Sequence, residues 1–160
     1  MRTFETALWA LFIIATLFAI TAGVSPPFVL ASGGLLSMLY FYTNICIVNN
    51  IGFNNTFKLS AYRDISVKKR ILSIALGFLY SLSVVAMIFE VLRWPGAHFM
   101  LCFSLFFVLV TLFLFIARKN KGNNSDFYLG LIKRNGFFLV VFVLFIVLSQ
   151  LIFKERFSDN

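Results

Sequence analysis

The chain has 160 residues, of which 61% are hydrophobic and only 12% charged, with a mean hydropathy of +0.94. A soluble domain carries charge on about a quarter of its residues, so this composition excludes a water-soluble globule and indicates helices that face lipid. The net charge of +8 lies in the segments between apolar stretches, with no basic stripe interleaved with aromatics. We therefore expect the lipid bilayer rather than nucleic acid as the partner of these cations.

Five apolar stretches of about 17 to 22 residues predict one all-α membrane domain over residues 1–160, a polytopic bundle of about five transmembrane helices. At a rise of about 1.5 Å per residue, each stretch matches a hydrocarbon core of about 30 Å. None shows the alternation of polar and apolar residues that a membrane barrel strand requires. The predicted spans are residues 7–23, 28–48, 71–92, 98–117 and 136–153.

The first stretch has two interpretations. Arg2 followed by an apolar run and small residues is compatible with a secretory signal peptide. Glu5 lies in what would be its charged region, the run is long for a signal, and Pro26 and Pro27 lead at once into another apolar stretch. We therefore expect a retained helix, with cleavage as the alternative.

A patch of small residues lies in the second stretch, at Ser32, Gly33 and Gly34. Small side chains let two membrane helices approach closely, so we expect this patch to pack against a neighbouring helix. The alternative is a substrate notch of the kind found in broken transporter helices, which normally occur in symmetry-related pairs.

The junction of the third and fourth stretches holds the main candidate functional cluster, Glu90, Arg93, Trp94, Pro95, Gly96 and His98. Glu90 is the only acidic residue inside a predicted span, where an unpaired carboxylate would be costly, and Arg93 follows about one helical turn later. Pro95 stops the helix, Gly96 permits a turn and Trp94 suits a membrane interface. The cluster therefore predicts a tight helical hairpin with an ion pair, or alternatively a proton or ion path lined by Glu90, Arg93 and His98.

The segment Phe89-Glu90-Val91-Leu92-Arg93-Trp94-Pro95-Gly96-Ala97 resembles a helix-end motif of small membrane proteins of the Bacteroidetes. The best-known member of this group is the two-helix inner-membrane subunit of the gliding-motility and type IX secretion motor. Glu90 stands where the family has lysine, and Arg93 where it has histidine. The resemblance implies a related hairpin and a bacterial inner-membrane location.

Residues 118–135 begin with polar side chains and then place Phe127, Tyr128, Leu131 and Ile132 at helical spacing. This spacing predicts a short interfacial helix, with Ser125 or Asp126 as its N-cap, ahead of the fifth span.

Orientation follows from the distribution of basic residues. With five spans, the N-terminus and the segments 49–70 and 118–135 share one side and hold eleven of the Lys and Arg residues, against three on the other side. The excess of cations predicts a cytoplasmic N-terminus and an external C-terminus.

The sequence contains no nucleophile–base pair, glycine-rich phosphate loop or paired carboxylates, so we predict no catalytic residues and favour a protein that is not an enzyme. Cys46, Cys102 and His98 lack metal-ligand spacing, and we expect no metal or cofactor. We expect an accessory or assembly subunit that acts through contacts with a membrane-protein partner or a second copy. The alternatives are an oligomeric channel or transporter component and a membrane enzyme acting on lipid.

Overall fold

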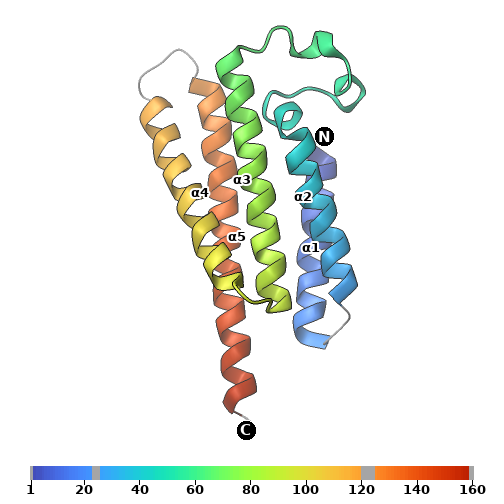
Figure 1. The fold of residues 1–160 in the computed structure, drawn as a ribbon, viewed down its shortest axis with the longest axis vertical. Helices are drawn as coiled ribbons and strands as arrows, with labels where there is room; N and C mark the ends of the chain where they lie inside the picture. Colours follow the sequence, from blue (N-terminus) through green and yellow to red (C-terminus); the bar gives the residue numbers. More distant parts are fainter. Residues whose placement is uncertain (1, 23–25, 120–124, 159–160) are drawn as a thin grey trace.

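The structure is a computed structural model that describes residues 2–22, 26–119 and 125–158. These residues form five long α-helices that run alternately up and down, with two 3-10 turns and no strand (Figure 1). The helices are α1 (Arg2–Ala22), α2 (Pro26–Val48), α3 (Val67–Leu92), α4 (Ala97–Lys119) and α5 (Ser125–Ser158), with η1 (Phe53–Asn55) and η2 (Leu59–Tyr62) between α2 and α3. The prediction of an all-α polytopic bundle is confirmed.

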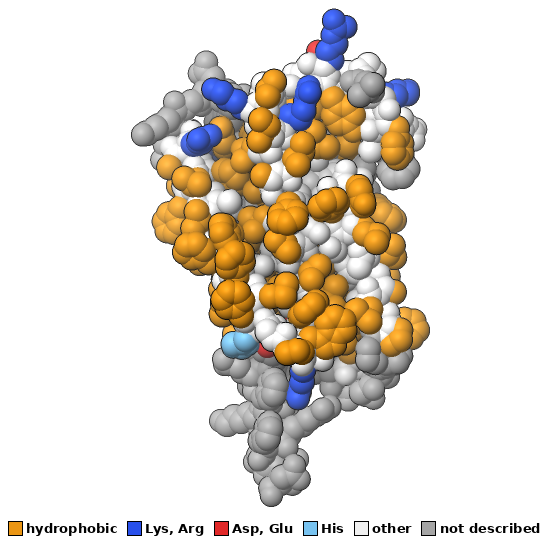
Figure 2. All heavy atoms as spheres, viewed as in Figure 1, with side chains coloured by type: hydrophobic (Ala, Val, Ile, Leu, Met, Phe, Trp, Pro, Cys, Tyr) orange, Lys and Arg blue, Asp and Glu red, His pale blue; other side chains and the backbone are white. Residues whose placement is uncertain are grey.

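Helices α2 to α5 are long and apolar enough to cross a bilayer, and α1 is apolar over Thr3–Ala19 and runs beside α2 (Figure 1). Hydrophobic side chains cover the middle of the visible face, while Lys and Arg gather mainly at one end (Figure 2). A surface of this kind is stable against hydrocarbon and not against water. The chain is an integral membrane protein.

The connections divide the bundle into two ends. The start of α1, the α2–α3 segment, the end of α4 and the start of α5 lie at one end, which we call the basic end (Figure 1). The end of α1, the start of α2 and the α3–α4 turn lie at the other end, which we call the hairpin end (Figure 1). The grouping of the basic segments at one end is the arrangement that the distribution of cations predicts.

Each helix packs mainly against the next in sequence, and α2 and α3 form the most extensive contact. Gly77 makes this contact possible, because a Cβ added there would lie 2.7 Å from the carbonyl oxygen of Tyr40 and 2.8 Å from the Cβ of Asn44. Asn44 in turn donates a 2.6 Å hydrogen bond to the carbonyl of Ser73 across the same interface. By contrast, α1 and α5 have few close backbone approaches and meet through side chains.

Of the two glycines in the small-residue patch of α2, only Gly33 lies against neighbouring helices. A Cβ on Gly33 would lie within 2.7–2.8 Å of Ile88 and Phe12, so this glycine lies against both α3 and α1. Gly34 faces open space, and the Ser32 hydroxyl donates to the carbonyl of Phe28 in its own helix. Close approach at this level of the bundle therefore depends on Gly33.

The α2–α3 segment is held against the helix ends by Tyr62. Its hydroxyl donates to the carbonyl of Thr56 and contacts Cys46 Sγ at 2.9 Å, while Arg70 donates to its carbonyl at 2.8 Å. Burial and the contact with Cys46 raise the pKa of Tyr62 to about 12, so the phenol stays neutral at physiological pH. The following helix α3 begins at Val67, so the basic cluster of residues 68–70 forms its first turn.

The sequence predicts a short interfacial helix followed by a separate fifth span, and the structure shows a single helix, α5, in their place. It is continuous from Ser125 to Ser158 and passes the ends of the other helices (Figure 1). Its 34 residues correspond to about 51 Å. The apolar spacing at residues 127–132 belongs to the first turns of this helix and packs against the core. Asp126 lies within the first turn, and the Ser125 side chain is outside the described residues.

Candidate functional site

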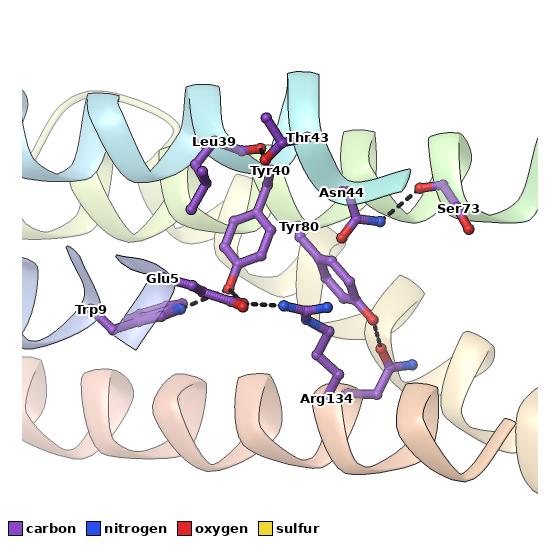
Figure 3. A network of polar contacts seen from close by, with 10 residues as sticks. Glu5, Trp9, Leu39, Tyr40, Thr43, Asn44, Ser73, Tyr80 and Arg134 are labelled. Carbon is purple, nitrogen blue, oxygen red and sulfur yellow. Dashed lines mark hydrogen bonds and ion pairs between the residues drawn. The ribbon is translucent and has the colours of Figure 1, made fainter. Parts of the chain in front are cut away.

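A polar network lies inside the bundle towards the basic end, where side chains from α1, α2 and α5 meet (Figure 3). Arg134 and Glu5 form an ion pair, and the Tyr40 hydroxyl donates a 2.6 Å hydrogen bond to the same carboxylate. The Trp9 indole donates to the Tyr40 hydroxyl at 2.7 Å. The ionic side chains are only 13% and 16% exposed, for Glu5 and Arg134 respectively, so the pair is mostly withdrawn from solvent.

A second branch joins α3, α4 and α5. The Tyr80 hydroxyl donates to Asn135 Oδ1 at 2.6 Å, and Asn135 Nδ2 donates to the Thr111 hydroxyl at 2.8 Å. Tyr80 and Asn135 are fully buried. Buried polar groups of this kind stabilise one specific helix arrangement only when every member finds a partner.

Aromatic rings join the two branches. Tyr40 and Tyr80 approach edge to face at 5.6 Å, and Phe138 stacks on Tyr80 at 4.5 Å. The Arg134 guanidinium lies 5.7 Å from the centre of the Tyr40 ring, within the range of a cation–π contact. One arginine is thus held both by a carboxylate from α1 and by a ring from α2.

Two hollows flank Arg134. The larger, of about 550 Å³, lies between α1 and α5 and is lined by residues that include Trp9, Lys133 and Phe137. The smaller, of about 320 Å³, lies beside the α2 end and is lined by residues that include Asn49, Lys69, Asp126 and Gly130. The network is therefore reached from the side of the bundle and from its basic end.

Sequence reasoning did not identify this network. In the sequence, Glu5 counts against a signal peptide, and Arg134 is one of the cations that indicate orientation. Asn135 fell just outside the predicted fifth span. The signal available was a carboxylate at the start of one apolar helix and an Arg-Asn pair at the start of another. Only their placement in adjacent helices makes them a site.

The predicted cluster of Glu90, Arg93, Trp94, Pro95, Gly96 and His98 lies at the hairpin end, on the turn between α3 and α4. The structure pairs Glu90 with His98, whose Nδ1 lies 3.4 Å from Glu90 Oε1. The carboxylate side chain is 8% exposed and the imidazole 72%. The sequence placed both residues in this cluster and predicted an ion pair of Glu90 with Arg93, and the structure adds His98 as a neighbour of the carboxylate.

Arg93 ends α3 in a left-handed conformation, with φ 55° and ψ 39°. Its N–H bonds to the carbonyl of Glu90, and the Trp94 N–H bonds to that of Phe89, which is the Schellman pattern of helix termination. The Trp94 and Phe89 rings pack at 4.7 Å, the hydrophobic contact that often accompanies this motif. Gly96 then takes φ +82°, which disfavours other residues, and α4 begins at Ala97. The cluster forms a tight turn in which the Glu90 carboxylate contacts His98.

The two polar regions are separated by an apolar layer. The large, fully buried side chains between them come from four helices and include Phe12, Leu36, Val84, Met87 and Phe142. The buried Ser32 and Ser83 hydroxyls in this layer donate to carbonyls of their own helices.

Metal-ligating and thiol side chains do not converge in the described residues. Residues 2–22, 26–119 and 125–158 contain no group of three or more His, Cys, Asp or Glu side chains that could hold a metal ion. Cys46 and Cys102 are both free thiols in different helices. The strongest local feature is the Glu5–Arg134 pair with its adjoining hollows. Comparison with known protein families, curated proteins and solved structures finds no match.

Proposed function

We propose that the protein is a small accessory or assembly subunit of a bacterial inner-membrane complex, and that it acts through contacts with a partner or a second copy. The observation that carries this proposal is the layer of buried apolar side chains inside the bundle. The side chains of the polar network bond to one another, the buried hydroxyls of Ser32 and Ser83 bond to backbone carbonyls, and an apolar layer separates the two polar regions. A channel or transporter needs polar groups that line a path near the membrane midplane.

The exposed surface of α4 supports a role in contacts with another membrane protein or a second copy of the chain. In the most apolar stretch of α4, only 22% of the residues are buried, against 50% in the corresponding stretch of α3. Phe99, Phe103 and Phe107 are exposed and their rings contact one another along the helix. Interfaces between membrane helices gain stability mainly from packing, and a row of rigid rings offers a defined surface for it.

The test is a photoreactive phenylalanine analogue placed singly at Phe103, with the equally lipid-facing Phe78 of α3 as a matched control. We expect one discrete crosslinked protein from Phe103 in native membranes and none from Phe78. Two differently tagged copies of the chain distinguish a homo-oligomer from a different partner. Crosslinking to lipid alone at both positions would contradict the proposal.

The channel alternative is tested separately by reconstitution into liposomes. We expect proton and ion flux no greater than in empty liposomes. Flux that is present in the unmodified protein and lost in Glu90→Gln, with insertion unchanged, would favour the channel and overturn the accessory role.

We further propose that the basic end faces the cytoplasm, with the N-terminus inside and the C-terminus outside. The eleven cations at the N-terminus and in segments 49–70 and 118–135 support this orientation. The bacterial inner membrane is proposed from the resemblance of residues 89–97 to the motor-subunit hairpin. A C-terminal fluorescent reporter that is dark in the periplasm should stay dark, and fluorescence would refute the orientation.

A further inference from the structure

The larger hollow is an amphipathic groove between α1 and α5, which we call the α1/α5 groove. Glu5, Lys133 and Arg134 line its polar end, while Trp9, Ala10, Ile13 and Phe137 line its apolar part. Its volume of about 550 Å³ lies within the range of small-ligand sites, about 300–1,000 Å³. It exists because α1 and α5 meet through side chains instead of packing backbone to backbone.

The two walls of the groove change from polar to apolar in the same direction. Both helices start at the basic end (Figure 1), so Glu5 and Lys133 precede Ile13 and Phe137 on their respective walls. From Glu5 to Ile13 the helix rises about 12 Å. A groove with charge at the membrane surface and apolar walls below it matches a phospholipid, whose headgroup and acyl chain follow the same order.

The charges at the polar end favour an anion. The Glu5 carboxylate already forms an ion pair with Arg134 and accepts a hydrogen bond from the Tyr40 hydroxyl. Lys133 is exposed, and among the described residues it has no ion-pair partner. With one carboxylate and two cations in its lining, the groove carries a net charge of +1. A phosphodiester beside Lys133 would neutralise this charge.

We propose that the α1/α5 groove binds an anionic phospholipid, with the phosphodiester at Lys133 and one acyl chain between Trp9 and Phe137. The Glu5–Arg134 pair positions α1 relative to α5 and so sets the width of the groove. This inference rests on membrane insertion and on the groove itself, and it does not depend on the proposed protein partner.

Native mass spectrometry of the full chain in a neutral detergent tests the proposal, with phosphatidylglycerol and phosphatidylcholine of identical acyl chains as probes. We expect phosphatidylglycerol to be retained about fivefold more, the effect of one cation near an anionic headgroup. Lys133→Gln should remove this preference. Lys68→Gln is the control, because it removes an exposed cation at the basic end outside the groove.

A second variant tests the acyl-chain part. Ala10→Phe fills the apolar part of the groove and should lower retention of both lipids, whereas Ala75→Phe adds the same ring to the exposed face of α3 and should not. Inorganic phosphate in excess distinguishes a lipid from a free anion. Displacement by phosphate together with indifference to Ala10→Phe would show an anion site and overturn the lipid proposal. Equal retention by Lys133→Gln and Lys68→Gln would overturn it as well.

Discussion

The ion pair between Glu5 and Arg134 gives the sharpest prediction about stability. Both side chains are mostly buried, and the carboxylate also accepts the Tyr40 hydroxyl. Arg134→Gln removes the cation and leaves a desolvated carboxylate, and Glu5→Gln leaves a desolvated guanidinium. Removing one partner of a buried pair costs about 3–5 kcal/mol. Because the side chains here keep some exposure, we expect about 3 kcal/mol for either substitution.

The double variant Glu5→Gln/Arg134→Gln separates the interaction from the loss of each side chain. It buries no unpaired charge, and two amides can still form a hydrogen bond. We therefore expect it to be less destabilised than the sum of the single variants by about 2 kcal/mol. The measurement is the free energy of unfolding in mixed micelles, followed by circular dichroism as a denaturing detergent is titrated in.

The control cycle uses Asp64→Asn and Lys68→Gln, which change exposed charges at the same end of the protein. These should be additive within about 0.5 kcal/mol. The reasoning would be refuted by single substitutions at Glu5 and Arg134 that each cost less than about 1 kcal/mol, or by a double variant equal to their sum. Either result would mean that the pair is solvated and does not hold α1 against α5.

Three further predictions concern packing, the buried amide and the hairpin. Gly77→Ala should cost about 1–3 kcal/mol, because its Cβ would lie 2.7 Å from a backbone carbonyl of α2, whereas Gly34→Ala, which faces open space, should not destabilise the bundle. Tyr80→Phe should cost about 1–3 kcal/mol because it leaves a buried amide oxygen without its donor, and the exposed Tyr42→Phe should have little effect in the same unfolding assay. Arg93→Gly should be more stable than Arg93→Ala by about 1 kcal/mol, since only alanine keeps the steric cost of the left-handed conformation. Equal melting temperatures for the last pair would contradict the assigned backbone conformation.

The sequence by itself determined the secondary structure and the ends of most helices. Apolar runs of span length require helices in lipid, because a strand or loop would leave backbone groups unsatisfied. Pro95 and Gly96 marked the α3–α4 turn for local reasons, since a proline cannot continue the helix and a glycine accepts a positive φ. Features that depend only on residues close together in the sequence can therefore be predicted from it. The fifth helix was the exception, because the polar residues at its start resembled a connection.

Only the tertiary structure decided where the polar site lies. Glu5 and Arg134 are 129 positions apart, and no periodicity relates them. Charged residues near a helix end serve equally well as orientation signals or as one half of a buried pair, so their role depends on which helices are adjacent. In this bundle α1 and α5 meet through side chains, and that incomplete contact creates both the ion pair and the groove beside it. Packing between distant segments, which hydropathy does not encode, sets this arrangement.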